Sequence, residues 1–261
     1  METMVNVKSN PVTTAVLLAA GTGSRLQPLT SDAPKCLTEV NGIAILERLI
    51  GCLRGHGFKR LVVVVGYLDH HVRKFLDEWK DELQIEYVVN SLYSTTNNLY
   101  SFWLARASIK EPFLLVESDV VFDDSLLEGM LQPDRIAISD SQCWMHGTTV
   151  TVDVSHQVSA FQVGSDSAPN EIHHKTVNMY TFTMASWCRV EERLSQHVAA
   201  GKVDEYYETV FAELIADGGL SLEAVVFDSA HWYEIDTLED LLEAEKIFPG
   251  RTRGKELSSP V

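Results

Sequence analysis

Cysteine is scarce in this chain, and its spacing excludes the common cysteine-based frameworks. The 261 residues contain four cysteines, and no two of them form a CxxC pair. Zinc ribbons and disulfide scaffolds both need cysteines at short, regular spacings. The sequence therefore favours a reduced, cytoplasmic protein without a structural zinc site.

Basic residues and long hydrophobic runs are also few. The chain has 21 Lys and Arg against 37 Asp and Glu, which gives a formal net charge of -16. Because nucleic acids and anionic membranes are bound by broad basic surfaces, we expect neither as a partner. No segment reaches the length of a membrane span, and residues 1–11 lack the apolar region of a signal peptide.

Apolar runs and helical patterns alternate through the first half of the chain. Continuous apolar runs, typical of buried parallel strands, occur at 13–20, 60–67, 85–90 and 112–122. Helical spacing lies between them, at 42–57, 70–80 and 97–109, and Asn97 or Asn98 is expected to cap the last of these helices. This alternation predicts an α/β protein whose parallel sheet is covered on both faces.

The second half has a different pattern. Apolar and polar residues alternate over 148–154 and 159–164, which predicts a hairpin with one solvated face. A strand at 176–183 is expected to rejoin the main sheet, and the remaining predicted elements are helices at 185–200 and 206–216, a strand at 223–229 and a helix at 237–248. We expect a single domain over 1–248 and a disordered tail over 249–261.

A glycine-rich loop with two basic residues follows the first strand. Residues 17–37 read LLAAGTGSRLQPLTSDAPKCL. Gly21 and Gly23 let the backbone approach a phosphate chain, and Arg25 offers a planar fork for phosphate oxygens. Lys35 returns on a loop stiffened by two prolines. Two permanent cations directed at one point suit a nucleoside triphosphate.

Two other glycine-loop chemistries do not fit this loop. A P-loop needs GxxxxGK[ST], which does not occur in the chain. The dinucleotide fingerprint GxGxxG/A needs a small third residue so that helix and strand pack closely, and Leu26 stands at that position. The sequence therefore argues against a kinase-like P-loop protein and against a nicotinamide-dependent oxidoreductase.

The segment from Leu18 to Leu37 resembles the signature LAAGxGxRLxPLTxxxPKxL. This signature belongs to nucleotidyltransferases with a glycosyltransferase-A-like fold, which activate sugar 1-phosphates, phosphocholine and phosphonates. The resemblance continues almost to Phe248. It implies a Rossmann-like, mostly parallel mixed sheet flanked by helices, with a small insertion of a β-hairpin and helices on the acceptor side.

The resemblance also implies roles for the loop residues. Gly21 and Gly23 would line the triphosphate, Arg25 would meet the outgoing pyrophosphate, and Lys35 would lie near the α-phosphate. The base would be recognised at the ends of the first and third strands, by Ala19, Ala20 and Asn90.

Two aspartates are candidate ligands for a metal ion. A triphosphate and a dianionic acceptor repel each other, since one like-charged pair at about 4 Å costs on the order of 4 kcal/mol at an effective dielectric constant of about 20. Mg²⁺ held by carboxylates relieves this repulsion. Asp119 interrupts an apolar strand, where an unpaired carboxylate is costly, and Asp236 precedes the last predicted helix. The resemblance implies that these two residues hold Mg²⁺.

Each aspartate also has a purely structural interpretation. Asp236 is well placed to cap the last helix, and Asp119 to accept hydrogen bonds from backbone amides at a strand end. Glu117 and Glu234 each lie two residues before one of the aspartates, and therefore on the same strand face. These glutamates either support the metal site or pair with a buried cation.

The chemistry that the resemblance implies needs no general base. A phosphate or phosphonate oxygen has a second pKa of about 6, so the nucleophile is already ionised at neutral pH. Positioning and charge neutralisation then suffice for in-line attack on the α-phosphorus with release of pyrophosphate. The sequence accordingly shows no Ser–His–Asp or Cys–His arrangement.

Several segments bear on the acceptor. Residues 95–105, TTNNLYSFWLA, resemble the NNxYSLxLA segment of phosphocholine cytidylyltransferases. Residues 175–183, 205–215 and 231–245 are most similar to cytidylyltransferases of phosphonate pathways. The resemblance implies CTP as the nucleotide, with a small phosphonate (2-aminoethylphosphonate or a hydroxyalkylphosphonate) or a phosphorylated amino alcohol such as phosphocholine as the acceptor.

The candidate acceptor residues have different chemistry. Lys175 and the amides near Asn98 suit a phosphonate, whereas Trp144, Trp232 or Tyr233 can stack on an ammonium group, with Asp140 or Asp153 nearby. His146 suits a hydroxylated tail. Each aromatic residue can equally belong to the core. A sugar-1-phosphate nucleotidyltransferase and a non-catalytic nucleotide-binding regulator are the alternatives in function, and a homodimer is left open.

Overall fold

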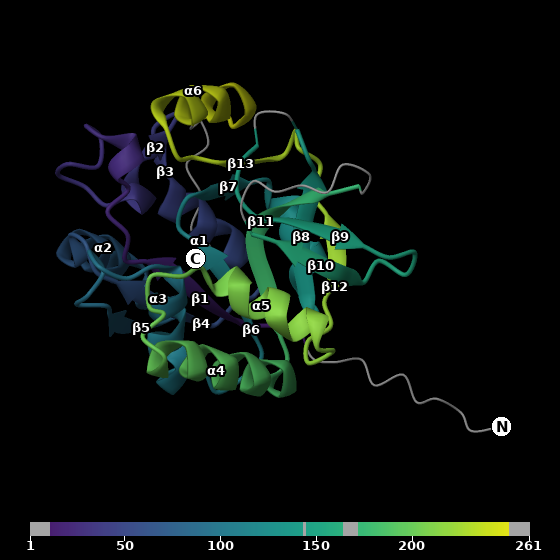
Figure 1. Ribbon diagram of the computed structural model, residues 1–261. Helices are drawn as coiled ribbons and strands as arrows, with labels where there is room; N and C mark the ends of the chain where they lie inside the picture. The colour runs from purple at the N-terminus through teal and green to yellow at the C-terminus, as the bar shows by residue number, and fades with distance from the viewer. Residues whose placement is uncertain (1–10, 143–144, 164–171, 251–261) are drawn as a thin grey trace.

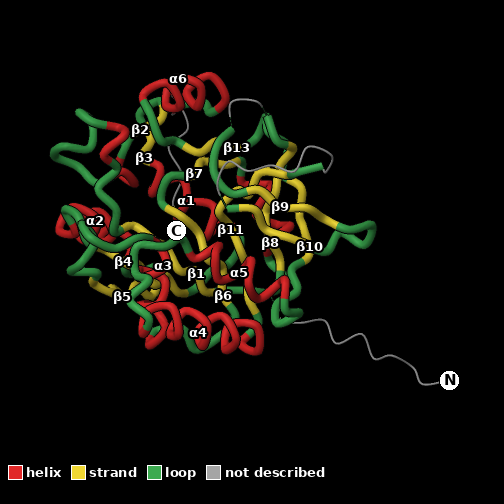
Figure 2. Tube along the Cα trace, in the orientation of Figure 1, coloured by secondary structure: helices red, strands yellow, loops and turns green. Residues whose placement is uncertain are grey.

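The computed structural model describes residues 11–142, 145–163 and 172–250. Its centre is a nine-stranded mixed sheet with helices on both faces (Figures 1 and 2). Four strands run parallel in the order β5 (Gln84–Val89), β4 (Arg60–Val65), β1 (Thr14–Ala19) and β6 (Phe113–Glu117). The predicted parallel half of the sheet is therefore confirmed.

Strand β11 (His174–Phe182) joins this parallel half to the rest of the sheet. It pairs antiparallel with β6, as expected of the segment predicted to rejoin the sheet. Beyond it lie the predicted hairpin and two further strands: β9 (Thr149–Val152), β10 (Val158–Gln162), β8 (Arg135–Asp140) and β12 (Glu223–Val226). The sequence reading did not predict β8.

The predicted strand over 112–122 is wrong as a single element. Strand β6 ends at Glu117, and after a two-residue turn β7 (Val120–Phe122) pairs with β13 (Trp232–Glu234) in a separate small sheet. A second small sheet joins β2 (Glu39–Val40) and β3 (Ile43–Ala44). The turn places Asp119 just beyond the carboxyl end of β6 instead of inside a strand.

Helices form a layer on each face of the main sheet. Side chains of β1 alternate between the two layers: Ala15 and Leu17 pack in the core that includes residues of α1 (Ile45–Gly55) and α2 (Asp69–Leu76). Val16 and Leu18 face the other core, which is built with α3 (Asn98–Leu104), α4 (Met184–Ala199) and α5 (Tyr207–Ala216).

A third, smaller core lies under α6 (Leu238–Ile247), which lies at the opposite end of the view from α4 in Figure 1. Within the described ranges, five 3₁₀ segments complete the secondary structure: Ser24–Leu26, Lys35–Leu37, Asp77–Trp79, Ala105–Ala107 and Asp124–Met130. Of the predicted tail, residues 251–261 lie outside the described residues. Among the helices of the described ranges, none is long and apolar enough to cross a membrane.

Candidate active site

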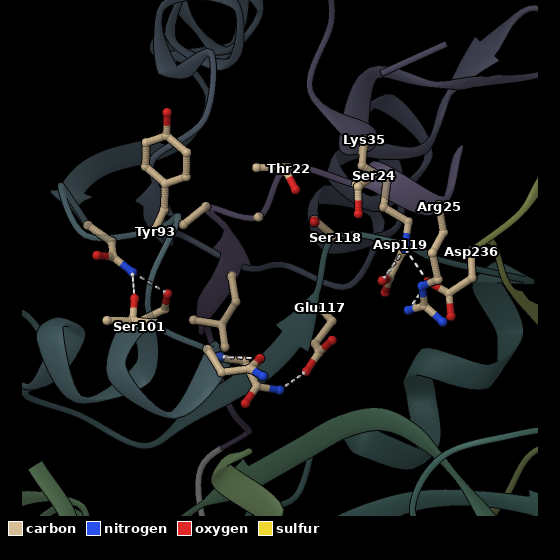
Figure 3. Close-up of a pocket in the computed structure, with 18 of the residues that line it drawn as sticks. Thr22, Ser24, Arg25, Lys35, Tyr93, Ser101, Glu117, Ser118, Asp119 and Asp236 are labelled. Atoms are coloured by element: carbon tan, nitrogen blue, oxygen red, sulfur yellow. Dashed lines mark hydrogen bonds and ion pairs between the residues drawn. The ribbon is translucent and has the colours of Figure 1, made fainter. Parts of the chain in front are cut away.

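A cavity of about 270 Å³ lies at the carboxyl ends of the parallel strands (Figure 3). Open α/β sheets bind ligands at this edge, where neighbouring strands send their loops in different directions. The cavity is lined by the loop after β1, the end of β5, the start of α3, the end of β6 and the segment before α6: Leu18, Ala20, Gly21, Thr22, Gly23, Ser24, Arg25, Lys35, Asn90, Tyr93, Thr96, Asn97, Asn98, Ser101, Glu117, Ser118, Asp119, Tyr206 and Asp236.

The loop after β1 depends on glycine at one position in particular. Gly23 has a φ of 61°, and a Cβ atom there would lie 3.0 Å from the Cβ of Lys35 and 3.1 Å from the Cγ2 of Thr30. The hydroxyl of Thr30 donates a hydrogen bond to the carbonyl oxygen of Gly23 at 2.8 Å. At Gly21, by contrast, an added Cβ meets no atom within 4 Å. Gly23 is thus needed for packing, and Gly21 leaves space in the cavity.

Leu26 explains why this loop is not a dinucleotide fingerprint. It ends a 3₁₀ turn instead of entering a long helix that packs on β1, and it is fully buried in the core beneath α6. A large apolar residue is required at this position by that core.

Lys35 lies between two carboxylates that come from distant parts of the chain. Its Nζ atom is 2.7 Å from Oδ2 of Asp119 and 2.6 Å from Oδ1 of Asp236. Burial favours the neutral amine, but the two carboxylates outweigh it and hold the pKa of Lys35 above its usual range. The ammonium group is therefore a permanent positive charge at the floor of the site.

Arg25 lies on the opposite side of Asp236 from the protein interior. Its Nη2 atom is 2.8 Å from Oδ1 of Asp236, and its side chain is 71% exposed. Both predicted cations line the cavity, as Figure 3 shows. The guanidinium group is therefore a largely exposed positive charge at the edge of the cavity.

Three carboxylates could hold a divalent cation at this site. One oxygen each of Asp119, Glu234 and Asp236 lies within 4.8 Å of the others. The buried Oδ1 of Asp119 has no hydrogen-bond partner among the described residues, although a buried carboxylate oxygen normally has one. Carboxylate oxygens are the ligands that Mg²⁺ prefers. The donor set therefore fits the expected ion, with Glu234 as an addition to the two predicted aspartates.

The structural interpretations of the two aspartates are wrong. Thr237, not Asp236, caps α6: its hydroxyl accepts from the backbone N–H of Asp240, whose carboxylate accepts from the Thr237 N–H in return. The carboxylate of Asp236 is thereby left to Lys35 and Arg25. Asp119 likewise accepts from the Lys35 side chain.

Glu234 is held in place by two residues of β11. Lys175 Nζ lies 3.0 Å from its Oε2 atom, and the side-chain amide of Asn178 donates to its Oε1 atom at 3.1 Å. Burial raises the pKa of Glu234, and the charge of Lys175 partly offsets this rise. Lys175, predicted to meet the phosphonate, is thus a buried counter-ion of Glu234; its side chain is 4% exposed.

Asn178 is a residue in contact with the carboxylate cluster that sequence reasoning missed. The pairing of β11 with β8 shifts register between Thr176 and Tyr180, and Asn178 within this bulge has a φ of 57°. Asparagine tolerates this left-handed conformation better than most residues. The bulge directs its amide at Glu234 instead of continuing the strand alternation. The only sequence signal was an asparagine inside an apolar run.

Asn97 and Asn98 open α3 at the edge of the cavity. Asn97 is the N-cap, and its side chain accepts from the N–H of Asn98. The Asn98 amide donates to Oε1 of Glu117 at 2.9 Å, and its Oδ1 accepts from the N–H of Tyr207 at 3.0 Å. Asn98, predicted to bind the acceptor, therefore lines the cavity while it joins α3 to β6 and α5.

Glu117 lines the cavity at the end of β6. Burial raises its pKa well above the usual range, and the carboxylates of Asp119 and Glu208 raise it further. The two glutamates singled out in the sequence therefore have different surroundings. Glu234 lies with the two aspartates, whereas Glu117 accepts a hydrogen bond from Asn98.

Of the three residues predicted to recognise the base, two line the cavity and one does not. Ala20 lines the cavity, whereas the Ala19 side chain packs in the core beside α1. Asn90 lines the cavity too, but its amide donates to Thr96 and Ser101, and its oxygen accepts from the N–H of Leu92. Asn90 thus shapes the 90–101 loop that forms one wall.

A second cavity of about 310 Å³ adjoins the first and shares Arg25 and Asp236 with it. Its other lining residues include three predicted acceptor contacts, His146, Lys175 and Trp232, together with Met145, Glu234, Thr237, Glu239 and Asp240. Trp232 is only 1% exposed and belongs mostly to the core. Trp144 lies outside the described residues.

The remaining acceptor alternatives lie away from both cavities. Tyr233 packs in the core beneath α6. Asp153 accepts backbone N–H groups in the turn between β9 and β10, and Asp140 lies beside His174.

Comparison with known proteins places this geometry in context. Residues 15–160 match the MobA-like NTP transferase domain. The chain is 34% identical over 258 residues to CMP-5'-(3-aminopropyl)phosphonate synthase of Streptomyces rubellomurinus, an alignment that covers 94% of this chain but only 40% of that protein. The chain thus spans less than half the length of this relative.

Two further proteins match along nearly their whole length. CTP:phosphoglutamine cytidylyltransferase of Campylobacter jejuni is 25% identical over 249 residues, with 87% of this chain and 97% of that protein covered. The structure of CTP:phosphocholine cytidylyltransferase from Streptococcus pneumoniae superposes with a TM-score of 0.76 at 22% identity, over 91% of this chain and 99% of that one. The predicted fold and the resemblance seen in the motifs are confirmed.

Proposed function

Because the chain belongs to the family of MobA-like NTP transferase domains, we propose that it transfers CMP from CTP to a small phosphonate or a phosphorylated amino alcohol and releases pyrophosphate. The observation that carries this proposal is the position of Lys35 between Asp119 and Asp236 at the floor of the cavity. Cations and carboxylates in one cavity suit a nucleoside triphosphate bound with a divalent ion. The choice of CTP is supported by the cytidylyl activities in the names of the relatives.

The roles of the residues follow from their positions. Gly21 and Gly23 leave the backbone of the loop accessible to the phosphate chain. Lys35 approaches the α-phosphate from the floor, and Arg25, at the solvent side, meets the β- and γ-phosphates and the pyrophosphate that leaves. Fixed positive charge at these points stabilises the extra negative charge of the transition state without any reorganisation.

Asp119 and Asp236 would hold Mg²⁺, with Glu234 beside them, and the bound ion would neutralise phosphate charge. The chain itself supplies orientation, because the loop after β1, the end of β6 and the segment before α6 all meet at Lys35. The acceptor oxygen is ionised at neutral pH, so no residue needs to remove a proton. The oxygen attacks the α-phosphorus in line, and the bond to the pyrophosphate oxygen breaks.

The second cavity is the proposed acceptor site. It adjoins the nucleotide cavity through Arg25 and Asp236, so an acceptor bound there would lie next to the bound nucleotide. His146 and Trp232 line it, and Glu239 adds an exposed carboxylate. These groups suit a small acceptor with a polar or cationic end, such as an aminoalkylphosphonate.

A panel of substrates tests this function. Purified protein with Mg²⁺ is given CTP, UTP, dTTP, ATP or GTP together with 2-aminoethylphosphonate, 3-aminopropylphosphonate, 2-hydroxyethylphosphonate, phosphocholine or glucose 1-phosphate. Pyrophosphate release and the mass of the product are measured, with Asp119→Asn as the inactive control. We expect CMP adducts of a phosphonate or of phosphocholine. Activity only with glucose 1-phosphate and UTP or dTTP would replace this proposal with a sugar-1-phosphate nucleotidyltransferase.

A further inference from the structure

A buried histidine behind the cavity contacts two carboxylates at once. His197 lies in the last turn of α4 and its side chain is 6% exposed. Its Nδ1 atom is 2.8 Å from Oε2 of Glu205, and its Nε2 atom is 3.1 Å from Oε2 of Glu213. Carboxylates only accept hydrogen bonds, so both contacts are hydrogen bonds when each ring nitrogen carries a proton. The imidazole thereby connects α4, the following loop and α5.

The charges around His197 come from each of these elements. Arg193 on α4 donates to Glu213 at 2.8 Å and to Asp217 at 2.6 Å, and Lys202 in the loop is 3.7 Å from Glu205. Burial acts to raise the pKa of Glu213, but its bonds to Arg193 and His197 outweigh burial and hold it below the usual range. Arg193 therefore ties α4 to α5 alone, whereas His197 also holds the loop.

The loop held in this way, residues 200–206, forms part of the cavity. The carbonyl oxygen of Val203 accepts from the N–H of Asn97 at 2.9 Å, and Tyr206 lines the cavity itself. Directly after the loop, the N–H of Tyr207 donates to Oδ1 of Asn98 at 3.0 Å. Asn97 and Asn98, which line the cavity at the start of α3, are thus hydrogen-bonded to the loop and to the residue that follows it.

We propose that His197 is a positioning residue, which holds the 200–206 loop through Glu205 and so fixes Tyr206, Asn97 and Asn98 as one wall of the substrate cavity. His197 itself touches no substrate. When its contact to Glu205 is lost, the loop gains freedom, and substrate must order the wall as it binds. Substrate binding is weakened, while the chemistry at Lys35 and Asp119 on the far side of the cavity proceeds as before.

Two variants loosen the loop, and one control separates this role from a structural one. His197→Leu removes both contacts, and Glu205→Ala removes the acceptor of the hydrogen bond from His197 Nδ1. Arg193→Gln removes the two bonds from α4 to α5 and leaves Glu205 untouched. All three variants remove contacts among α4, α5 and the loop between them. Only the changes at His197 and Glu205 release the loop.

Hydrogen exchange measures the loop without reference to activity. In His197→Leu and Glu205→Ala we expect the amides of Asn97 and Tyr207 to exchange at least about tenfold faster than in the unaltered protein, because the Asn97 N–H is bonded to the Val203 carbonyl oxygen in the loop and Tyr207 follows the loop directly. In Arg193→Gln these two amides keep their protection. Unchanged exchange in both loop variants overturns the proposal, whatever reaction the protein catalyses.

The kinetic test rests on the proposed function. For the two loop variants we expect KM for at least one of the two substrates to rise about fivefold or more with kcat within about twofold, the pattern of lost binding instead of lost transition-state contacts. Arg193→Gln should leave both constants within about twofold. Equal rises in KM for Arg193→Gln, or a fall in kcat alone for the loop variants, would show that His197 is only a brace between helices.

Discussion

Lys35 and Asp236 are 201 residues apart in the chain, yet Lys35 Nζ lies 2.6 Å from Oδ1 of Asp236. The same nitrogen is 2.7 Å from Oδ2 of Asp119, at the end of β6. Three segments that the sequence separates widely therefore meet at a single ammonium group. This contact joins the loop after β1 to the segment before α6, and it fixes the distance between the cation and the two carboxylates before any substrate arrives. Such preorganisation is a large part of catalysis by positioning.

Loss of either charge at this contact should abolish turnover. We expect Lys35→Ala and Asp119→Asn each to lower kcat by at least about 100-fold, because each removes a fixed charge at the position where the transition state develops its own. Pyrophosphate release measures the rate, and circular dichroism checks the fold. Lys59→Ala, which changes an exposed lysine, is the matched control. A kcat near the normal value in either variant would mean that the residue has another role.

Glu234 should affect the metal requirement separately from stability. EDTA is expected to stop the reaction and added Mg²⁺ to restore it. In Glu234→Gln we expect half-maximal activity to need several-fold more Mg²⁺, since a carboxylate near the proposed ion is lost. The same change leaves Lys175 buried without its ion partner, which costs on the order of 3 kcal/mol of unfolding free energy.

The double variant Glu234→Gln with Lys175→Met separates these two effects. Removal of both charges should recover most of the lost stability in a urea titration, because a buried pair is often replaced by apolar groups without loss. The raised Mg²⁺ requirement should persist. If the Mg²⁺ requirement returned to normal together with stability, Glu234 would have no part in metal binding.

The elements that sequence patterns predicted are those whose signal is local. Buried parallel strands are continuous apolar runs, so β1, β4 and β5 were found within a residue or two of their observed bounds. The loop from Gly21 to Lys35 carries its own signature. Asp119 was a candidate because its carboxylate interrupts an apolar run, and Asp236 because it stands just before the last predicted helix.

What the sequence could not predict depends on contacts between distant segments. The bulge at Asn178 lies in the pairing of β11 with β8, where the strand on the other side of β11 changes from β9 to β6, and no residue near it in the sequence indicates a φ of 57°. In the sequence alone, Lys175 has no visible ion partner. In the structure, β13 places Glu234 next to it. The sequence analysis offered a buried cation as one possible partner of Glu234, but it did not identify Lys175 as that cation.

The two glycines of the loop should respond differently to an added methyl group. Gly23→Ala combines a left-handed φ with contacts of 3.0 and 3.1 Å, so we expect it to lower the unfolding free energy by about 1–2 kcal/mol and to reduce kcat by displacing Lys35. Gly21→Ala meets no protein atom within 4 Å, and its stability should be unchanged. Because its methyl group enters the cavity, KM for CTP should rise. Urea unfolding and steady-state kinetics measure both; equal stability losses would contradict the assignment of the two glycines.

Glu208 should make the stability of the protein depend on pH. It lies in the first turn of α5, it is 4% exposed, and its Oε2 atom has no hydrogen-bond partner among the residues that the structure describes. Burial raises its pKa to about 7, from an ordinary value of 4.5. Between these two values the folded protein keeps the proton that the unfolded chain has lost. The contribution of Glu208 to stability is therefore complete below pH 4.5 and is lost as the pH rises toward 7.

Glu208→Gln removes this titration and should flatten the pH dependence. The amide resembles the protonated carboxyl group, so the variant and the unaltered protein should have similar unfolding free energies at about pH 5, whereas at about pH 8 the variant should be more stable by on the order of 2–3 kcal/mol. Urea titrations at several pH values across this range measure the difference, and Glu192→Gln, on the exposed surface of α4, is the control. A constant offset between Glu208→Gln and the unaltered protein at every pH would show that Glu208 does not change its protonation in this range, because a fixed packing difference cannot vary with proton concentration.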